Sequence, residues 1–141
     1  MLPQTEFGPL VTVDRSDFDD CYNFASSLPE CISLLQSVLS PNWVNIKGTK
    51  YQPGMAVILK ISENGAPVFG VIDIIFVCDK DVMFLYSYLL TVGFDEHAHA
   101  YEVEYSDMKS SINQEDLYDP LPLSIYHSVL GLKFIVLRHS L

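Results

Sequence analysis

The spacing of apolar residues changes along the chain, from a helical period in the first 40 residues to a period of two afterwards. Within residues 16–25, apolar positions recur at helical spacing behind a candidate N-cap, Ser16. Residues 27–39 begin with a capping box, Ser27 with Glu30, and carry one apolar stripe before Pro41. The pattern therefore predicts one or two N-terminal helices.

After Pro41 the chain reads as a series of short strands separated by turn residues. The expected strands, with one before the helices, are Leu10–Val13, Trp43–Ile46, Met55–Ile61, Val68–Val77, Val82–Val92, His97–Tyr105, Leu121–His127 and Leu132–His139. Asn64-Gly65 predicts a hairpin with a type I′ turn, because both residues accept a positive φ. The fold class expected is mostly β (α+β): a small curved antiparallel sheet or a partly open SH3-like barrel with the N-terminal helices.

Val68–Val77 is apolar on both faces apart from Asp73, so a central position in the sheet is expected. Gly70 inside this run predicts a bulge or the close approach of another backbone. A buried carboxylate needs a partner, so Asp73 is expected to bond to an amide, a lysine or a tyrosine hydroxyl; an acid or base role is the alternative. Further along, Gly93 is expected to open a loop.

The length of 141 residues, with 49% of them hydrophobic, fits a single domain, 1–141. In this prediction a helical portion, 1–41, packs on a β portion, 42–141. No apolar run approaches the ~20 residues that cross a bilayer, and the first residues lack the features of a secretory signal. The expected location is cytoplasmic or nuclear, away from membranes.

The formal net charge of −10 disfavours direct nucleic-acid binding, which normally needs a basic stripe. Residues 95–119 alone hold eight acids and one base, Lys109. The cysteines, Cys21, Cys31 and Cys78, have neither CxxC nor finger spacing, and reduced, buried thiols are expected. No nucleophile elbow or phosphate loop is present, and no cofactor is expected.

His97 and His99, two residues apart in an expected strand, point to one face and are candidates for a metal pair. His127, His139 or Asp95 could supply a third ligand. The alternative is that both histidines make ordinary hydrogen bonds on a partly exposed strand, because an HxH pair is not a specific metal motif. A pH switch is a further alternative, since histidine titrates near neutrality.

Tyrosines are the other candidate binding residues. Phe84, Tyr86 and Tyr88 share one face of an expected strand, and Tyr101 and Tyr105 share a face with the two histidines. Such a set could line a groove for a peptide or a methylammonium group, but core packing of a curved sheet explains the same residues. The expected binding residues are His97, His99, Tyr101, Tyr105, Tyr86 and Tyr88.

Three motifs stand out in the β portion: Tyr51-Gln52-Pro53-Gly54, Pro67-Val68-Phe69-Gly70 and Phe94-Asp95-Glu96-His97-Ala98-His99-Ala100-Tyr101-Glu102-Val103. With them, residues 43–138 resemble an animal domain without an assigned activity, found in transposon-associated proteins that sometimes carry zinc fingers. The resemblance implies a larger nuclear or mobile-element-derived protein. It supplies no catalytic residues, and this chain lacks finger spacing. The order of turns and strands also resembles chromatin reader barrels of the bromo-adjacent-homology type.

The sequence is thus interpreted as a non-enzymatic module that binds a protein or peptide through the segment from His97 to Tyr105. Self-association through a strand edge or an apolar helix stripe is a second use of the same surfaces. The rival hypothesis is a metal-dependent hydrolase built on His97 and His99.

Overall fold

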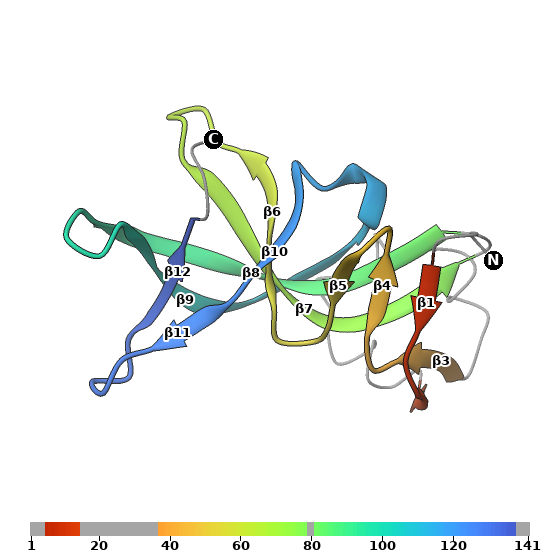
Figure 1. The fold of residues 1–141 in the computed structure, drawn as a ribbon. Helices are drawn as coiled ribbons and strands as arrows, with labels where there is room; N and C mark the ends of the chain where they lie inside the picture. The colour runs from red at the N-terminus through yellow and green to blue at the C-terminus, as the bar shows by residue number, and fades with distance from the viewer. Residues whose placement is uncertain (1–4, 15–36, 79–80, 138–141) are drawn as a thin grey trace.

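Twelve β-strands and one short 3-10 turn make up the part of the chain that the computed structural model describes, residues 5–14, 37–78 and 81–137 (Figure 1). The elements are β1 (Thr5–Phe7), β2 (Leu10–Asp14), β3 (Ser37–Pro41), β4 (Val44–Ile46), β5 (Thr49–Tyr51), β6 (Ala56–Ile61), β7 (Pro67–Cys78), β8 (Asp81–Asp95), β9 (Ala100–Asn113), η2 (Gln114–Asp116), β10 (Asp119–Leu123), β11 (Ile125–His127) and β12 (Lys133–Val136). The prediction of a mostly β fold is therefore confirmed.

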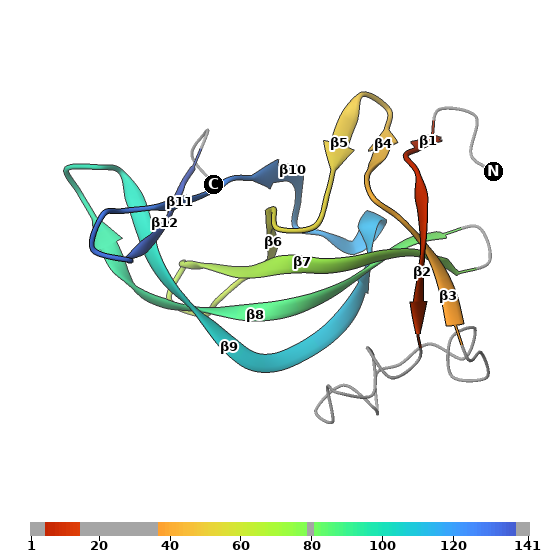
Figure 2. The same ribbon diagram turned by 90° about the horizontal axis from the view of Figure 1, so that it is seen from below.

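The main sheet has seven strands in the order β10-β6-β7-β8-β9-β12-β11, and every neighbouring pair is antiparallel. Its two outermost strands, β10 and β11, follow each other in the chain with only Ser124 between them. Because one residue spans little more than 3 Å, the sheet must curl until its two edges come together. Figures 1 and 2 show the resulting half-barrel, in which β7, β8 and β9 bend deeply.

Interruptions in strand pairing accompany this curl. The β7–β8 pairing shifts register between Ile72 and Ile74, which leaves Asp73 without a cross-strand partner. The β8–β9 pairing shifts between Ser87 and Leu89, where Tyr88 alone faces the three residues 106–108. Bulges bend a strand and increase its twist, so these two sites help a long hairpin to curve.

Two smaller sheets complete the described fold. β1, β4 and β5 form one of them, and the tight β4–β5 turn has positive φ at both Lys47 and Gly48, as a type I′ turn requires. β2 and β3 form a two-stranded ribbon that packs on β7, where the Ser40 hydroxyl donates to the Ile75 carbonyl at 2.5 Å (Figure 2).

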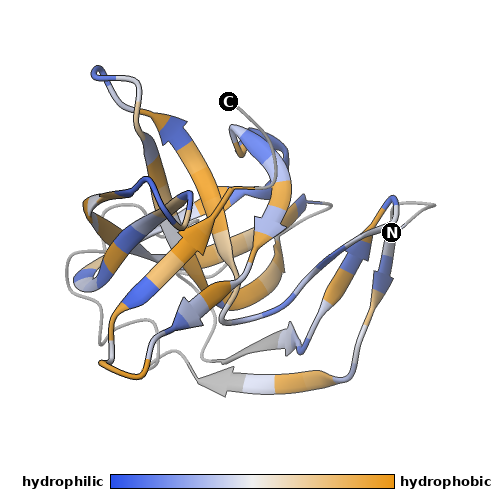
Figure 3. Ribbon diagram, turned by 60° about the vertical axis from the view of Figure 1, so that its left-hand side comes forward, coloured by the Kyte–Doolittle hydropathy of each residue, from blue (hydrophilic) through white to orange (hydrophobic). Residues whose placement is uncertain are grey.

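The main sheet buries apolar side chains on both faces. The inner face, inside the curl, carries a cluster drawn from six strands: Ala56, Ile58, Phe69, Val71, Leu89, Val103, Leu123 and Ile135. The outer face of β6, β7 and β8 is covered by the small β1-β4-β5 sheet and by Leu117, which gives a second cluster: Val44, Ile46, Tyr51, Val57, Leu59, Ile72, Ile75, Val82, Phe84, Tyr86 and Leu117. Orange bands along the central strands in Figure 3 mark this apolar content. The predicted central position of Val68–Val77, now part of β7, is confirmed.

The N-terminal helices are not confirmed. No α-helix occurs in the described ranges, and the predicted helix over 16–25 lies outside them, as does most of the one over 27–39. The last residues of the second predicted helix, from Ser37 onward, belong to β3 and pair with β2. From Ser37 onward, pairing with β2 has overridden the helical spacing. The strand predicted at Leu10–Val13 is confirmed as β2, and Thr5–Phe7 adds a further strand to the expected helical portion.

The hairpin at Asn64-Gly65 is confirmed, but the predicted turn type is wrong. Only Gly65 has a positive φ, +85°, and its amide donates to the Ser62 carbonyl at 2.9 Å. The Ser62 amide in turn donates to the Ala66 carbonyl at 2.8 Å. This is a three-residue loop in which a type I turn is followed by a left-handed glycine, the G1 bulge arrangement.

Gly70 permits a close approach, as predicted, but the approaching group is a side chain rather than a backbone. A Cβ atom at this position would lie 2.8 Å from Cδ1 of Tyr86 and 3.2 Å from Cδ1 of Leu59. The tyrosine ring therefore packs directly on the glycine backbone, across the β7–β8 pairing. The bulge of β7 lies at Asp73 instead.

Candidate functional site

The two candidate metal ligands of the sequence lie in a turn rather than a strand. β8 continues through Gly93 to Asp95, so the loop predicted at Gly93 is wrong, and residues 96–99 form the tip of the β8–β9 hairpin. The Asp95 carboxylate accepts the amides of His97, at 2.9 Å, and Ala98, at 3.2 Å. His99 has a φ of 50°. A cap of this kind holds a turn, which is why the alternation does not continue into it.

The histidines are exposed and are not brought together. His127 lies on β11 opposite Lys133, two strands away from β9, whereas His97 and His99 lie beyond the last pair of the hairpin, Asp95 with Ala100. His139 lies outside the described residues. Over 5–14, 37–78 and 81–137, no three His, Cys, Asp or Glu side chains are grouped as ligands of a metal ion. The geometry offers no metal centre in these ranges.

The candidate tyrosines occupy three different environments. Tyr86 and Tyr88 stack edge to face at 5.1 Å on the outer face, and the Tyr86 hydroxyl donates to the Tyr88 hydroxyl at 3.1 Å. Tyr101 contacts Phe69 and Phe94 with ring centroids 5.6 and 4.8 Å apart. Tyr105 lies under Lys133, whose Nζ is 5.0 Å from the ring centroid. They do not converge into one aromatic cage.

Burial of Tyr86 has a consequence at alkaline pH. Burial and the bond to Tyr88 raise the pKa of Tyr86 well above its ordinary value of 10.0. The unfolded chain therefore releases this proton first, so the free energy of unfolding should fall as pH rises above about 10. Tyr86→Phe should make this fall shallower, by up to about 1.4 kcal/mol per pH unit, in urea titrations between pH 9 and 11. Equal flattening by Tyr118→Phe, on an exposed tyrosine, would contradict this explanation.

A cleft of ≈ 570 Å³ lies where the two bulges meet, and we call it the inner cleft. Its polar walls come from β7, β8 and β9, and the Pro53-Gly54 turn closes one side. The side chains that matter for its chemistry are Asp73, Ser87, Tyr105, Ser106, Asp107 and Lys109. Register places it on the inner face, because Ala56, Val71, Ser87 and Lys109 are successive cross-strand partners.

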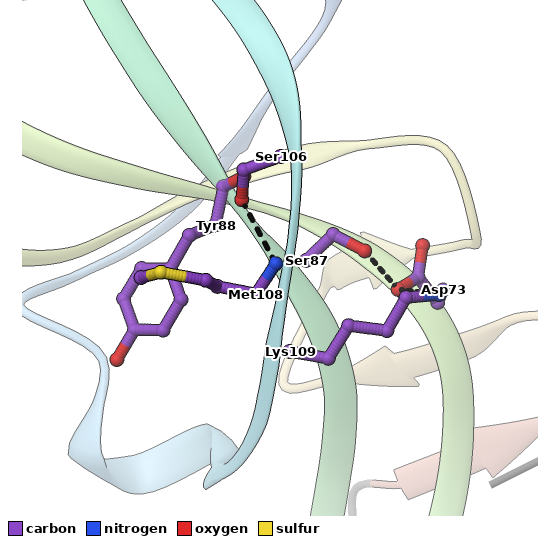
Figure 4. A network of polar contacts seen from close by, with 6 residues as sticks. All are labelled: Asp73, Ser87, Tyr88, Ser106, Met108 and Lys109. Carbon is purple, nitrogen blue, oxygen red and sulfur yellow. Dashed lines mark hydrogen bonds and ion pairs between the residues drawn. The ribbon is translucent and has the colours of Figure 1, made fainter. Parts of the chain in front are cut away.

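Asp73 is the centre of the polar network in the inner cleft (Figure 4). Its Oδ2 accepts the Ser87 hydroxyl at 2.6 Å and lies 3.5 Å from Nζ of Lys109. Of the partners predicted for Asp73, a lysine is confirmed, at ion-pair distance, whereas the hydrogen bond comes from a serine that was not predicted. Ser87 lies on the adjacent strand, β8, and Lys109 lies on β9, one strand further across the sheet.

The neighbouring polar contacts hold the backbone of the β9 bulge. The Ser106 hydroxyl donates to the Tyr88 carbonyl at 2.7 Å and accepts the Met108 amide at 3.2 Å (Figure 4). It therefore replaces the ladder bonds that the shift in register removes. The Ser87 hydroxyl donates its hydrogen bond to the Asp73 carboxylate, which is already paired with Lys109. These contacts of Ser87 therefore do not include the separate general base that activates a serine nucleophile.

The outer face has a second notable feature, at the end of β8. Alternate residues Val82, Phe84 and Tyr86 are buried under the small sheet, and Tyr88 is half-buried. The next one, Leu90, is 51% exposed. The apolar side of the strand therefore continues beyond the end of its cover.

Register identifies the neighbours of Leu90 on this uncovered face. Leu90 pairs with Glu104, and the next row contains Tyr126, Phe134 and Glu102. Val136 lies on the same side of β12 as Phe134. Tyr126 and Val136 are exposed. We call this surface, composed of Leu90, Glu102, Glu104, Tyr126, Phe134 and Val136, the outer patch.

The β11–β12 turn adds exposed apolar residues next to the outer patch. Val129 and Leu130 form its tip, and both are exposed. The Ser128 hydroxyl accepts the amides of Leu130 and Leu132 at 3.2 and 3.1 Å, so the turn is held in shape. Figure 1 shows this hairpin and the β8–β9 hairpin projecting at the same end of the molecule.

Sequence reasoning found Asp73 and Tyr105 but missed the other members of the inner cleft and most of the outer patch. The exposed Leu130 had one available signal, an apolar pair directly before Gly131 in a turn. Comparison of the chain with family models, curated proteins and solved structures finds no match. No helix in the described ranges is long and apolar enough to cross a membrane.

Proposed function

We propose that the chain is a non-enzymatic module that binds a protein through the outer patch. The supporting observation is that the outer face of β8 is still apolar at Leu90, although the small β1-β4-β5 sheet no longer covers the strand there. Exposing a large apolar side chain forgoes about 1.5–3 kcal/mol of burial. Several such residues gathered at one end of a sheet are typical of an interaction surface.

The charges of the outer patch support a partner of opposite charge. Glu102 and Glu104 lie among its apolar side chains, Asp95 and Glu96 lie at the adjoining hairpin tip, and the chain as a whole carries −10. A complementary partner presents lysine or arginine around an apolar surface. An anionic membrane or a nucleic acid would be repelled. His97 and His99 extend the proposed surface at the hairpin tip.

A displayed peptide library, selected on the purified protein, tests this function. Selected peptides should combine basic and apolar residues, and Leu90→Ser should weaken their binding by about tenfold. Leu10→Ser is the matched control, because Leu10 is 57% exposed on β2, outside the outer patch. Glu104→Lys should also weaken binding, whereas Glu63→Lys, at the β6–β7 turn, should not.

Two results would count against the proposal. If the selected peptides lack basic residues, the charge of the outer patch does not choose the partner. If Leu90→Ser and Leu10→Ser weaken peptide binding equally, the outer patch is not the binding site. The remaining alternative is that a second copy of this chain binds the outer patch. Light scattering tests it: a dimer that dissociates on Leu90→Ser would identify that second copy as the partner.

The sequence resemblance supports a wider context. We also infer that the half-barrel is of the SH3-like type, on the basis of its consecutive antiparallel strands, and that the chain serves in a larger nuclear or mobile-element-derived protein. A basic, apolar partner agrees with that context, since proteins associated with nucleic acids carry basic segments.

A further inference from the structure

We propose that the inner cleft is a second binding site, which takes a guanidinium group. The cleft has a volume of ≈ 570 Å³, within the range of small-ligand sites. It lies on the inner face, opposite the outer patch. The inference therefore stands independently of the proposed function.

Asp73 supplies the acceptor for such a group. Its Oδ2 accepts a hydrogen bond from the Ser87 hydroxyl and forms the ion pair with the Lys109 ammonium. In the described part of the chain Oδ1 has no hydrogen-bond or ion-pair partner, and the side chain is 28% exposed where it lines the cleft. A carboxylate held in place by one oxygen can accept a charged donor with the other at little further cost in ordering.

The other walls of the inner cleft also suit a flat cation. Tyr105 is 49% exposed, and its ring already attracts one cation, Lys133. Asp107 brings a second carboxylate, so the residues that line the cleft include two carboxylates and one ammonium, that of Lys109, while the Lys133 ammonium lies nearby against the Tyr105 ring. A planar group can stack on an aromatic ring while its edge donates to carboxylates.

Other ligand charges fit less well. An anion would meet Asp73 and Asp107, and the ammonium that could attract it is already paired with Asp73. A methylammonium group prefers a cage of several rings, whereas Tyr105 is the aromatic residue that lines this cleft. An alkylammonium supplies a point charge without the planar face. The guanidinium group uses both the ring and the carboxylates.

The test is an amide NMR titration of the full chain with Nα-acetyl-arginine N-methylamide. The matched probe is the corresponding citrulline compound, which has the same shape without the charge. Amides of Asp73, Ser87 and residues 105–109 should shift saturably with arginine, and citrulline should bind at least about tenfold more weakly. Free L-arginine and a blocked Ala-Arg-Ala peptide then distinguish a small-molecule ligand from an arginine of a peptide.

Variants assign the effect to the cleft. Asp73→Asn should weaken arginine binding by about tenfold, while Asp81→Asn, an exposed aspartate at the start of β8, should leave it unchanged. Tyr105→Ala should also weaken arginine binding. It leaves Asp73 in place and therefore tests the cleft even if Asp73→Asn perturbs the fold. Equal binding of citrulline, or shifts centred on the exposed acids Glu115 and Asp116, would overturn the proposal. Because Leu90→Ser leaves the inner cleft intact, failure of one proposal is distinguishable from failure of the other.

Discussion

Phe84→Ala should lower the free energy of unfolding by about 3–5 kcal/mol, the largest loss expected from a single substitution in this chain. The Phe84 side chain is fully buried between the main sheet and the small sheet, with its ring centroid 5.1 Å from that of Tyr51. Removing it leaves a cavity at the contact that holds the two sheets together. Urea denaturation followed by tyrosine fluorescence measures the loss.

Phe94→Ala is the matched control for this prediction. Phe94 lies on the same strand, but its side chain is 48% exposed, and its main contact is the ring of Tyr101 at 4.8 Å. Its removal should cost about 1 kcal/mol. Similar losses from the two variants would mean that the small sheet contributes little to stability.

Gly70→Ala should destabilise the chain by about 1–3 kcal/mol, the range for one methyl group forced into a filled space. The added Cβ would lie 2.8 Å from the Tyr86 ring, which the Tyr88 hydroxyl and the surrounding core hold in position. The ring cannot withdraw without breaking these contacts. Thermal unfolding monitored by circular dichroism provides the measurement.

Gly93→Ala separates the effect of crowding from the general effect of replacing a strand glycine. A Cβ at Gly93 meets nothing within 4 Å, and Gly93 is not among the glycines with positive φ. This variant should be neutral or more stable by about 0.5 kcal/mol. If both alanine variants lose the same stability, close packing by Tyr86 is not the reason for the glycine at position 70.

The strands of the β portion were predictable because their apolar residues alternate and strong turn residues separate them. Boundaries failed where a side-chain cap or the partner strand decides. The strand expected from His97 begins at Ala100, because the Asp95 cap forms a turn, and β8 runs through Gly93 because its partner continues. Residues 106–113 are polar, so no strand was expected, yet they continue β9, and residues 109–113 pair with β8.

The candidate sites were predictable only in part. Asp73 was noticeable as the charged residue of an apolar strand, but nothing in its local sequence specifies Ser87 or Lys109 as partners. Their proximity depends on the register across three strands and on two bulges, which are properties of the assembled sheet. The outer patch depends on where the small sheet ends, and that is equally non-local.

The closure of the main sheet through Ser124 also bears on which strand edges are open to pairing with another chain. β7 and β8, the most apolar strands, lie inside the sheet, where both of their edges are paired. The outermost strands are short, and β10 carries Pro120 and Pro122, which lack the amide that an added strand would need. The edges of the main sheet are thus guarded in a chain with 49% hydrophobic residues. The proposed partner would therefore dock on a face of this sheet, where side chains rather than backbone decide the fit.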